Sequence, residues 1–136
     1  MQIEEVVRRQ KPRRKVQGIS AALLPFEADG RVAVAGFQQH LLTTQRAGLM
    51  NAVNMDTGFV NYLSDAEKGE VLGWAREALG EGVAFVAGAY IEGHDGDVVQ
   101  LYRREMDRIV AHGGIPILFQ TARLHGKPAQ EKAVTY

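Results

Sequence analysis

Short apolar runs recur along the chain, and each is followed by a polar, glycine-containing turn and then by a segment with helical periodicity. The runs begin near Ile19, Leu49, Val83 and Ile115, so their starts are separated by 30, 34 and 32 residues. Such a spacing is typical of a βα unit, and nearly continuous apolar strands are typical of parallel sheets that are buried on both faces. The pattern therefore predicts four consecutive βα units.

Local signals set the ends of the predicted helices. The helix after the first strand ends at Gly48, and the serine and glutamate of residues 64–67 form a capping box at the start of the second helix. Asp95 or Asp97 suits the N-cap of the third helix, and Pro128 suits the first residue of a fourth. Alternating units of this kind predict either an open doubly wound α/β sheet or a (β/α) barrel.

Composition narrows the class of protein. The 136 residues are 46% hydrophobic and 24% charged, which argues against a disordered chain, and 16 basic residues balance 16 acidic ones. The absence of cysteine excludes a disulfide framework and a thiolate nucleophile, and it favours a cytoplasmic location. No apolar run approaches the roughly 18 residues of a membrane span. We therefore expect no membrane partner.

A basic segment precedes the first predicted strand, with six basic residues among residues 8–15. It could bind nucleic acid or phosphate, or it could be a solvated N-terminal segment that packs beneath the sheet. Because no aromatic residue interleaves the charges, we favour the second interpretation and expect no nucleic-acid partner. The predicted organisation is a basic segment over residues 1–17 followed by the βα units over residues 18–136.

Nucleotide-binding motifs are absent. The first strand is followed by the sequence LPFEADG where a dinucleotide fold carries G-x-G-x-x-G, and no Walker-type glycine loop occurs. The acidic residues and histidine of residues 92–97 could bind a divalent metal, but an N-cap role for one of the aspartates is the simpler interpretation. We therefore expect neither a cofactor nor a metal.

Four segments in the same order resemble motifs of the dihydrodipicolinate synthase and N-acetylneuraminate lyase family of class I aldolases. They are residues 18–30 (the opening strand and an Asp-Gly turn), 56–67, 86–88 and 127–131. The resemblance implies a (β/α)8 barrel of the TIM type, of which this chain supplies about the first four units, a half barrel. It also implies a homo-oligomer, commonly a tetramer.

The resemblance implies a lyase that forms a Schiff base between a lysine on the sixth strand and pyruvate or another 2-oxo acid. In the family the loop after strand two holds the substrate carboxylate through hydroxyls and backbone amides, and a tyrosine after strand four relays protons. Thr57 and Gly58 match that loop and are candidate substrate-binding residues. Asn54, near the end of the second predicted strand, is a third.

The chain also departs from the family pattern. Asp56 replaces the first hydroxyl residue of the family loop. Because a carboxylate repels a substrate carboxylate, Asp56 suits a general acid/base role or contact with a hydroxyl of a sugar-like substrate better than binding of pyruvate. An equal alternative is that Asp56 caps the loop through backbone amides. Either His125 or, in another alignment, Phe119 or Thr121 takes the place of the relay tyrosine. Our candidate catalytic residues are Asp56 and His125.

No lysine matches the Schiff-base residue, because the chain ends before a fifth strand. Of the five lysines, only Lys127 is expected in a loop at the carboxyl end of a strand, and the family pattern explains it as a helix-start residue. We therefore expect the 136-residue chain alone to be inactive. The alternative hypothesis is a family-derived chain that has lost catalysis and acts as a binding or assembly subunit.

Overall fold

The computed structural model describes Ile3 and residues 15–135. Of the predicted basic segment (residues 1–17), residues 1–2 and 4–14 therefore lie outside the described residues, and of its six basic residues only Lys15 is described. No helix in the described part of the chain is long and apolar enough to cross a membrane.

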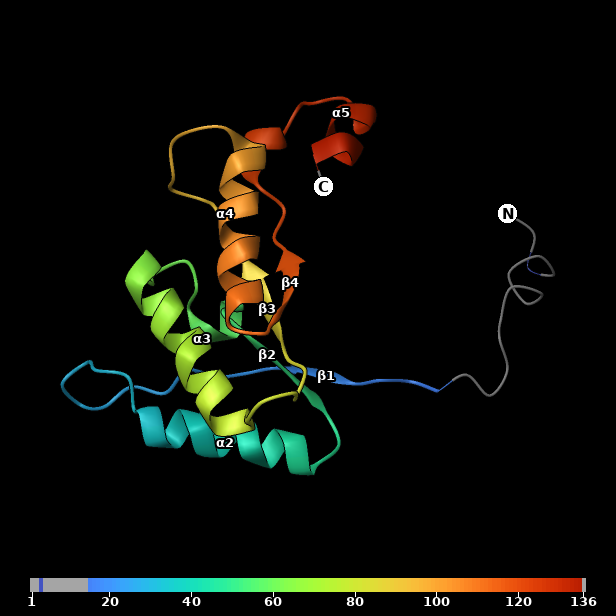
Figure 1. The fold of residues 1–136 in the computed structure, drawn as a ribbon. Coiled ribbons are helices and arrows are strands. Elements are labelled where there is room, and N and C mark those ends of the chain that lie inside the picture. Colours follow the sequence, from blue (N-terminus) through green and yellow to red (C-terminus); the bar gives the residue numbers. More distant parts are fainter. Residues whose placement is uncertain (1–2, 4–14, 136) are drawn as a thin grey trace.

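Four parallel strands form one sheet in the order in which they occur along the chain (Figure 1). They are β1 (Ile19–Ala21), β2 (Met50–Val53), β3 (Val86–Ala89) and β4 (Ile115–Leu118). A doubly wound sheet would reverse its strand order at a switch point, whereas here each new strand adds to the same edge. This order is that of a (β/α) barrel, so the four predicted units are confirmed.

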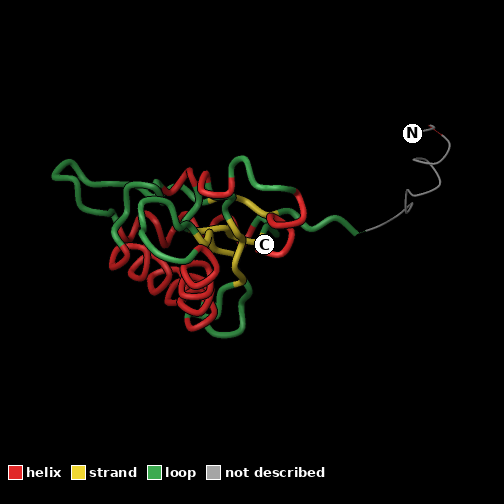
Figure 2. The backbone as a smooth tube through the Cα atoms, turned by 90° about the horizontal axis from the view of Figure 1, so that it is seen from above, coloured by secondary structure: helices red, strands yellow, loops and turns green. Residues whose placement is uncertain are grey.

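A helix follows each strand. The four helices are α2 (Val34–Arg46), α3 (Asp65–Leu79), α4 (Val98–Ala111) and α5 (Ala129–Thr135). Two 3-10 helices, η1 (Asp56–Gly58) and η2 (Ala122–Leu124), lie in the loops after β2 and β4. Viewed from above, the long helices lie on one side of the strands (Figure 2). The main core fills the space between these helices and the sheet; its largest fully buried side chains include Phe37, Leu41, Leu72, Phe85, Ile91 and Ile109.

The capping signals read from the sequence are confirmed. The Ser64 hydroxyl accepts a hydrogen bond from the Glu67 amide at 3.3 Å, and the Ser64 amide donates to the Glu67 carboxylate at 2.7 Å. Gly48 follows the end of α2 with a φ of 79°, a conformation that glycine adopts at little cost. Asp97, rather than Asp95, caps α4 by accepting from the Gln100 amide at 3.0 Å.

Three details differ from the predicted elements. The third strand begins at Val86 instead of Val83, because Val86 is the residue that aligns with Ala52 of β2 and Ile115 of β4. Pro128 lies just before α5, and its carbonyl accepts the bond from the Lys132 amide. The sequence analysis did not predict the 3-10 helices.

Arg76 fixes the ends of α3 and α4 at the edge opposite to the strand carboxyl ends. Its guanidinium donates hydrogen bonds to four backbone carbonyls, those of His112 (2.9 Å), Gly113 (2.8 Å), Gly80 (2.6 Å) and Val83 (3.0 Å). It also lies 5.0 Å from the centre of the Phe85 ring. One planar side chain thus satisfies the carbonyls that the two helix ends and the following loops leave free.

We expect the Arg76→Met substitution to lower the free energy of unfolding by about 2–3 kcal/mol, because it keeps the aliphatic stem but removes all four charge-assisted hydrogen bonds. Urea denaturation measures this change. Arg103→Met is the matched control, since Arg103 is an exposed arginine on α4. Equal stability of the two variants would show that the carbonyls are satisfied equally well by water.

Candidate active site at the carboxyl ends of the strands

The loops that follow β2, β3 and β4 meet at one edge of the sheet. All four strands are parallel, so their carboxyl ends lie at the same edge, which is where barrel enzymes place their active sites. Gly88 of β3 allows the loops to come together there: a Cβ at this position would lie 2.2 Å from the Asn54 carbonyl oxygen and 2.5 Å from the Phe119 ring. Asn54, Gly88 and Phe119, at the ends of three strands, therefore lie close to one another.

The η1 turn contains Asp56, Thr57 and Gly58. The Thr57 hydroxyl donates a 2.9 Å hydrogen bond to the carbonyl of Ala22, which follows β1, and Gly58 is buried with its amide bonded to the Met55 carbonyl. In the described part of the chain, the amides of Asp56 and Thr57 have no hydrogen-bond acceptor. The turn therefore presents two free N–H donors, while its one threonine hydroxyl hydrogen is already used to hold the loop.

The Asp56 side chain is exposed, and no hydrogen bond from it to a backbone amide occurs within the described residues. The alternative that Asp56 serves to cap the loop is therefore not what the structure shows. Its negative charge is close enough to Tyr90 to contribute to the shift in the pKa of that phenol. Asp56 is thus placed as a carboxylate open to solvent at the rim of the site.

Tyr90 is a residue of this site that the sequence analysis missed. It follows β3 directly, its ring packs edge-on against Phe119 with centroids 5.7 Å apart, and the Lys68 ammonium lies 5.6 Å from its ring centre. Burial, and then the charges of Glu92 and Asp56, raise the pKa of Tyr90, so the phenol keeps its proton at neutral pH. Its place in the sequence, directly after the third apolar run, is the signal that could have indicated a residue of the site.

Asn54 lies at the site, but its side chain is directed toward a helix. It is 3% exposed, its φ is 50°, and its amide nitrogen donates to the Lys68 carbonyl in the first turn of α3 at 3.1 Å. Asparagine tolerates the left-handed conformation better than most residues. The contact indicates that Asn54 fixes the entry into the η1 loop, and its other amide atom, Oδ1, is buried without a partner in the described residues.

Three residues were candidates for the position of the relay tyrosine. Phe119 follows β4 directly, and its ring contacts Tyr90; the buried Thr121 hydroxyl bonds Glu92. His125 lies farther along, in the exposed turn that ends η2. The phenol at the carboxyl ends of the strands is therefore that of Tyr90, which follows β3 and packs against Phe119.

Glu92 connects the loop after β3 to η2. Its carboxylate accepts a 2.6 Å hydrogen bond from the Ala122 amide at the start of η2. The hydrogen bond from Thr121 is the largest influence on the pKa of Glu92 and lowers it. The Ala122 amide and the charges of Arg123 and His125 also lower this pKa, whereas burial raises it. The pKa of Glu92 is lowered overall. Glu92 is therefore an ionised carboxylate whose oxygens face protein donors, and His125 lies within reach of its charge.

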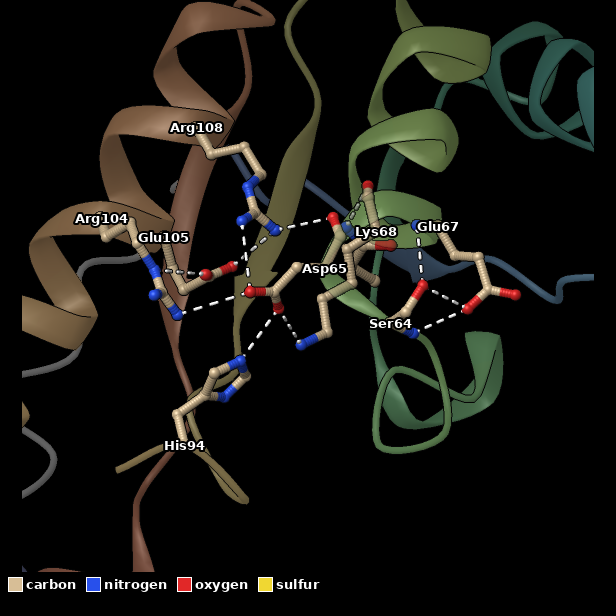
Figure 3. Close-up of polar contacts among 9 residues, drawn as sticks. Ser64, Asp65, Glu67, Lys68, His94, Arg104, Glu105 and Arg108 are labelled. Atoms are coloured by element: carbon tan, nitrogen blue, oxygen red, sulfur yellow. Dashed lines mark hydrogen bonds and ion pairs between the residues drawn. The ribbon is translucent and has the colours of Figure 1, made fainter. Parts of the chain in front are cut away.

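Asp65, the first residue of α3, is the centre of a polar cluster between α3 and α4 (Figure 3). Its carboxylate lies 3.0 Å from His94 Nε2, 3.3 Å from Lys68 Nζ, 3.5 Å from Arg104 and 3.7 Å from Arg108. Burial is the largest influence on the pKa of Asp65 and raises it, but the hydrogen bond from Lys68 and the charges of His94, Lys68 and Arg108 lower it overall. The cluster holds the start of α3 against α4 and against the loop after β3.

The lysines of the described residues have separate surroundings. Lys68 is only 4% exposed and is held by Asp65, although it reaches the Tyr90 ring at the site, which the sequence analysis did not anticipate. Lys127 is half exposed and pairs with Glu131 at 3.1 Å, as suits the start of a helix. Neither lysine has the position of a family Schiff-base residue on a strand.

The acidic loop after β3 does not converge on one point. Asp97 caps α4, Glu92 binds the start of η2, and His94 binds Asp65. Within the described residues, no group of three or more histidine, aspartate or glutamate side chains could hold a metal ion. Each of these three side chains instead has a contact with a helix or its neighbouring loop.

The comparisons with known proteins define the class of fold first. Three solved structures share it, each over about 37–38% of its own length. The 4-hydroxy-tetrahydrodipicolinate synthase of Methylacidiphilum fumariolicum SolV matches 86% of this chain with a TM-score of 0.67 and 18% identity. The dihydrodipicolinate synthase of Aquifex aeolicus matches 85% of this chain with a TM-score of 0.63 and 16% identity. The N-acetylneuraminate lyase of Mycoplasma synoviae matches 78% of this chain with a TM-score of 0.57 and 19% identity. The chain is thus a half barrel of the (β/α)8 type.

The sequence comparison then confirms the resemblance in family. The chain is 31% identical over 116 residues to 4-hydroxy-tetrahydrodipicolinate synthase 2 of Streptomyces coelicolor, a match that covers 83% of this chain and 36% of the relative. No family model matches the chain. The chain is thus similar to part of proteins of the dihydrodipicolinate synthase and N-acetylneuraminate lyase family, from which it has diverged, and it spans little more than a third of the length of the relatives it matches.

We expect the Asp65→Asn substitution to lower the free energy of unfolding by about 1–2 kcal/mol at pH 7, because it leaves the buried Lys68 without its counter-charge. A carboxyl whose folded-state pKa is lowered stabilises the protein above its ordinary pKa of about 4, and that contribution is lost as the pH falls through the folded-state value. The difference between the wild type and the variant should therefore shrink below about pH 5.

Urea denaturation at a series of pH values measures this effect. Asp107→Asn on the exposed face of α4 is the control, and we expect it to follow the wild-type pH profile. A constant difference between wild type and Asp65→Asn from pH 7 to pH 3 would contradict the assigned role of the Asp65 charge.

Proposed function

We propose that this chain provides the carboxylate-binding and proton-transfer part of an aldolase-type lyase site for pyruvate or another 2-oxo acid, and that the Schiff-base lysine lies outside the chain. The observation that carries the proposal is the η1 turn, which follows β2, has amides at Asp56 and Thr57 without an acceptor in the described residues, and lies near enough to Tyr90 for the Asp56 charge to act on that phenol. The family to which the chain is similar holds a substrate carboxylate at the corresponding loop. Backbone N–H groups are suitable donors to a carboxylate.

The substrate-binding residues in this proposal have different roles. Thr57 contributes its amide and uses its hydroxyl to fix the loop to Ala22. Gly58 is the buried end of the turn, and its amide bond to the Met55 carbonyl closes it. Asn54 is a positioning residue that acts through its bond to the Lys68 carbonyl.

Proton transfer is assigned to the groups around Tyr90. A Schiff base draws electrons from the neighbouring carbon, so making or breaking a carbon–carbon bond requires a proton to be removed or supplied near that carbon. Tyr90 is protonated at neutral pH and can donate, and Asp56 is a carboxylate that can accept a proton from substrate or water. His125, at the η2 side of the edge, is the second candidate acid/base group.

The Asp56→Asn substitution should strengthen pyruvate binding about fivefold at low ionic strength, because it removes a negative charge beside the proposed carboxylate site. Titration of the isotope-labelled chain with pyruvate, followed through the amide resonances of residues 56–58, measures the affinity. The gain should decrease in about 0.5 M salt, where charges are screened. Asp107→Asn is the control with the same charge change at a distant exposed position. Unchanged affinity in Asp56→Asn would rule out a carboxylate bound at η1.

We also expect no covalent adduct when the 136-residue chain is treated with borohydride in the presence of pyruvate, because no lysine of the described residues lies on a strand, where the family has its Schiff-base residue. Mass spectrometry of the intact chain detects the adduct. A reduced adduct on Lys68, Lys127 or Lys132 would contradict the assignment of the Schiff-base residue to another part of the barrel.

A second candidate function is a binding or assembly subunit without catalysis. The observation that favours it is Asp56, whose exposed carboxylate stands where the family has a hydroxyl residue. The pyruvate titration separates the two candidates, because a pure assembly subunit would not bind pyruvate at residues 56–58. Oligomerisation stays a prediction; among the similar solved structures is a monomeric dihydrodipicolinate synthase variant (TM-score 0.67, 16% identity), so barrels of this kind also occur as monomers.

A further inference from the structure

A separate cavity of about 220 Å³ lies between η2 and α5, beyond the carboxyl end of β4. It is lined by Gln120, Thr121, Leu124, His125, Lys132 and Ala133. The volume equals that of about seven water molecules at the density of the liquid. The cavity therefore has room for the acidic end of a small organic molecule.

The charged groups of this cavity favour an anion. Lys132 is half-buried on α5 and makes no ion pair within the described residues, and the His125 ring, on the η2 side, can donate a hydrogen bond. Gln120 adds an amide that can also donate. Among the described residues, no carboxylate lines the cavity. The cavity thus combines one unpaired cation with two neutral donors.

The neighbouring carboxylates are already engaged by other groups. Glu131, the residue before Lys132, pairs with Lys127 at 3.1 Å. Glu92, whose pKa is lowered in part by the charge of His125, directs its oxygens to Thr121 and to the Ala122 amide. Lys132 therefore keeps its positive charge available to a ligand instead of to its own helix.

We propose that this cavity binds a carboxylate, and that it recognises an acidic group on the substrate at a distance from the reacting keto carbon. The assignment of this cavity to the substrate rests on the proposed function, whereas the anion site itself does not. The class of ligand is thus a small dicarboxylate, such as a 2-oxo acid that carries a second carboxylate. Lys132 and His125 would be its specificity-determining contacts.

Succinate tests the anion site without a keto group. In the isotope-labelled chain, we expect succinate to shift the amide resonances of residues 120–125 and 132–133. Lys132→Gln should weaken binding about tenfold, which is the loss expected for one charge-assisted hydrogen bond. Lys127→Gln is the matched control, because it removes a lysine on the same segment that pairs with Glu131, and it should leave the affinity within about twofold. Lys132→Arg keeps the charge and should retain binding.

Equal affinities for succinate in Lys132→Gln and Lys127→Gln would overturn the site, as would the absence of shifts at residues 120–133. Circular dichroism of each variant checks that the helices are unchanged, and the Lys132→Arg variant separates loss of charge from loss of α5. If Lys132→Arg loses binding as fully as Lys132→Gln while both remain folded, the charge of Lys132 is not what binds succinate.

The substrate assignment needs a comparison of 2-oxoglutarate with pyruvate. We expect 2-oxoglutarate to bind about tenfold more tightly than pyruvate, to shift residues 56–58 and 120–133 together, and to lose that advantage in Lys132→Gln. If 2-oxoglutarate binds no more tightly than pyruvate, the cavity does not belong to the substrate site. If pyruvate fails to shift residues 56–58 while succinate still shifts residues 120–133, the proposed function fails and the anion site stands.

Discussion

The close approach of three strand ends at Gly88 is the constraint on which the candidate site depends. A side chain at this position would overlap the carbonyl oxygen of Asn54 and the ring of Phe119, because a Cβ would lie only 2.2 and 2.5 Å from them. Parallel pairing alone brings the strand ends to one edge, but it does not bring the loops after β2 and β4 into contact with β3. Glycine permits this contact, and the charges of Asp56 and Glu92, from two loops, both act on the Tyr90 phenol.

The Asp65 cluster fixes the outer layer around that edge. A carboxylate in the first turn of α3 is favoured by the helix dipole, and here it also faces side chains from α4 and from the loop after β3. The same cluster explains why Lys68 is buried, since Asp65 supplies the counter-charge and Tyr90 supplies an aromatic face. The Tyr90 ring is thus in contact with a lysine that belongs to the cluster between the two helices.

The sequence was sufficient for the features that depend on near neighbours in the chain. Apolar runs, the capping box at Ser64 and the glycine after α2 are all local signals, and the structure contains each of them. The residues at the site were predicted less completely. Asp56, Thr57 and Gly58 lie in one turn as expected, whereas the bond of Asn54 to Lys68 depends on a left-handed backbone and on the packing of α3. Such contacts carry no periodic signal.

The distribution of charge along the site edge suggests how a substrate would be oriented. The η1 side carries the solvent-exposed carboxylate of Asp56 next to free amides, and the far side carries Lys132 without a partner in the described residues. A molecule with a single carboxylate would gain backbone hydrogen bonds at η1 but would meet the repulsion of Asp56. A second carboxylate held by Lys132 would offset that repulsion at a different point of the molecule. The replacement of a hydroxyl residue by Asp56 is therefore compatible with an acidic substrate if the opposite side of the edge supplies the attraction.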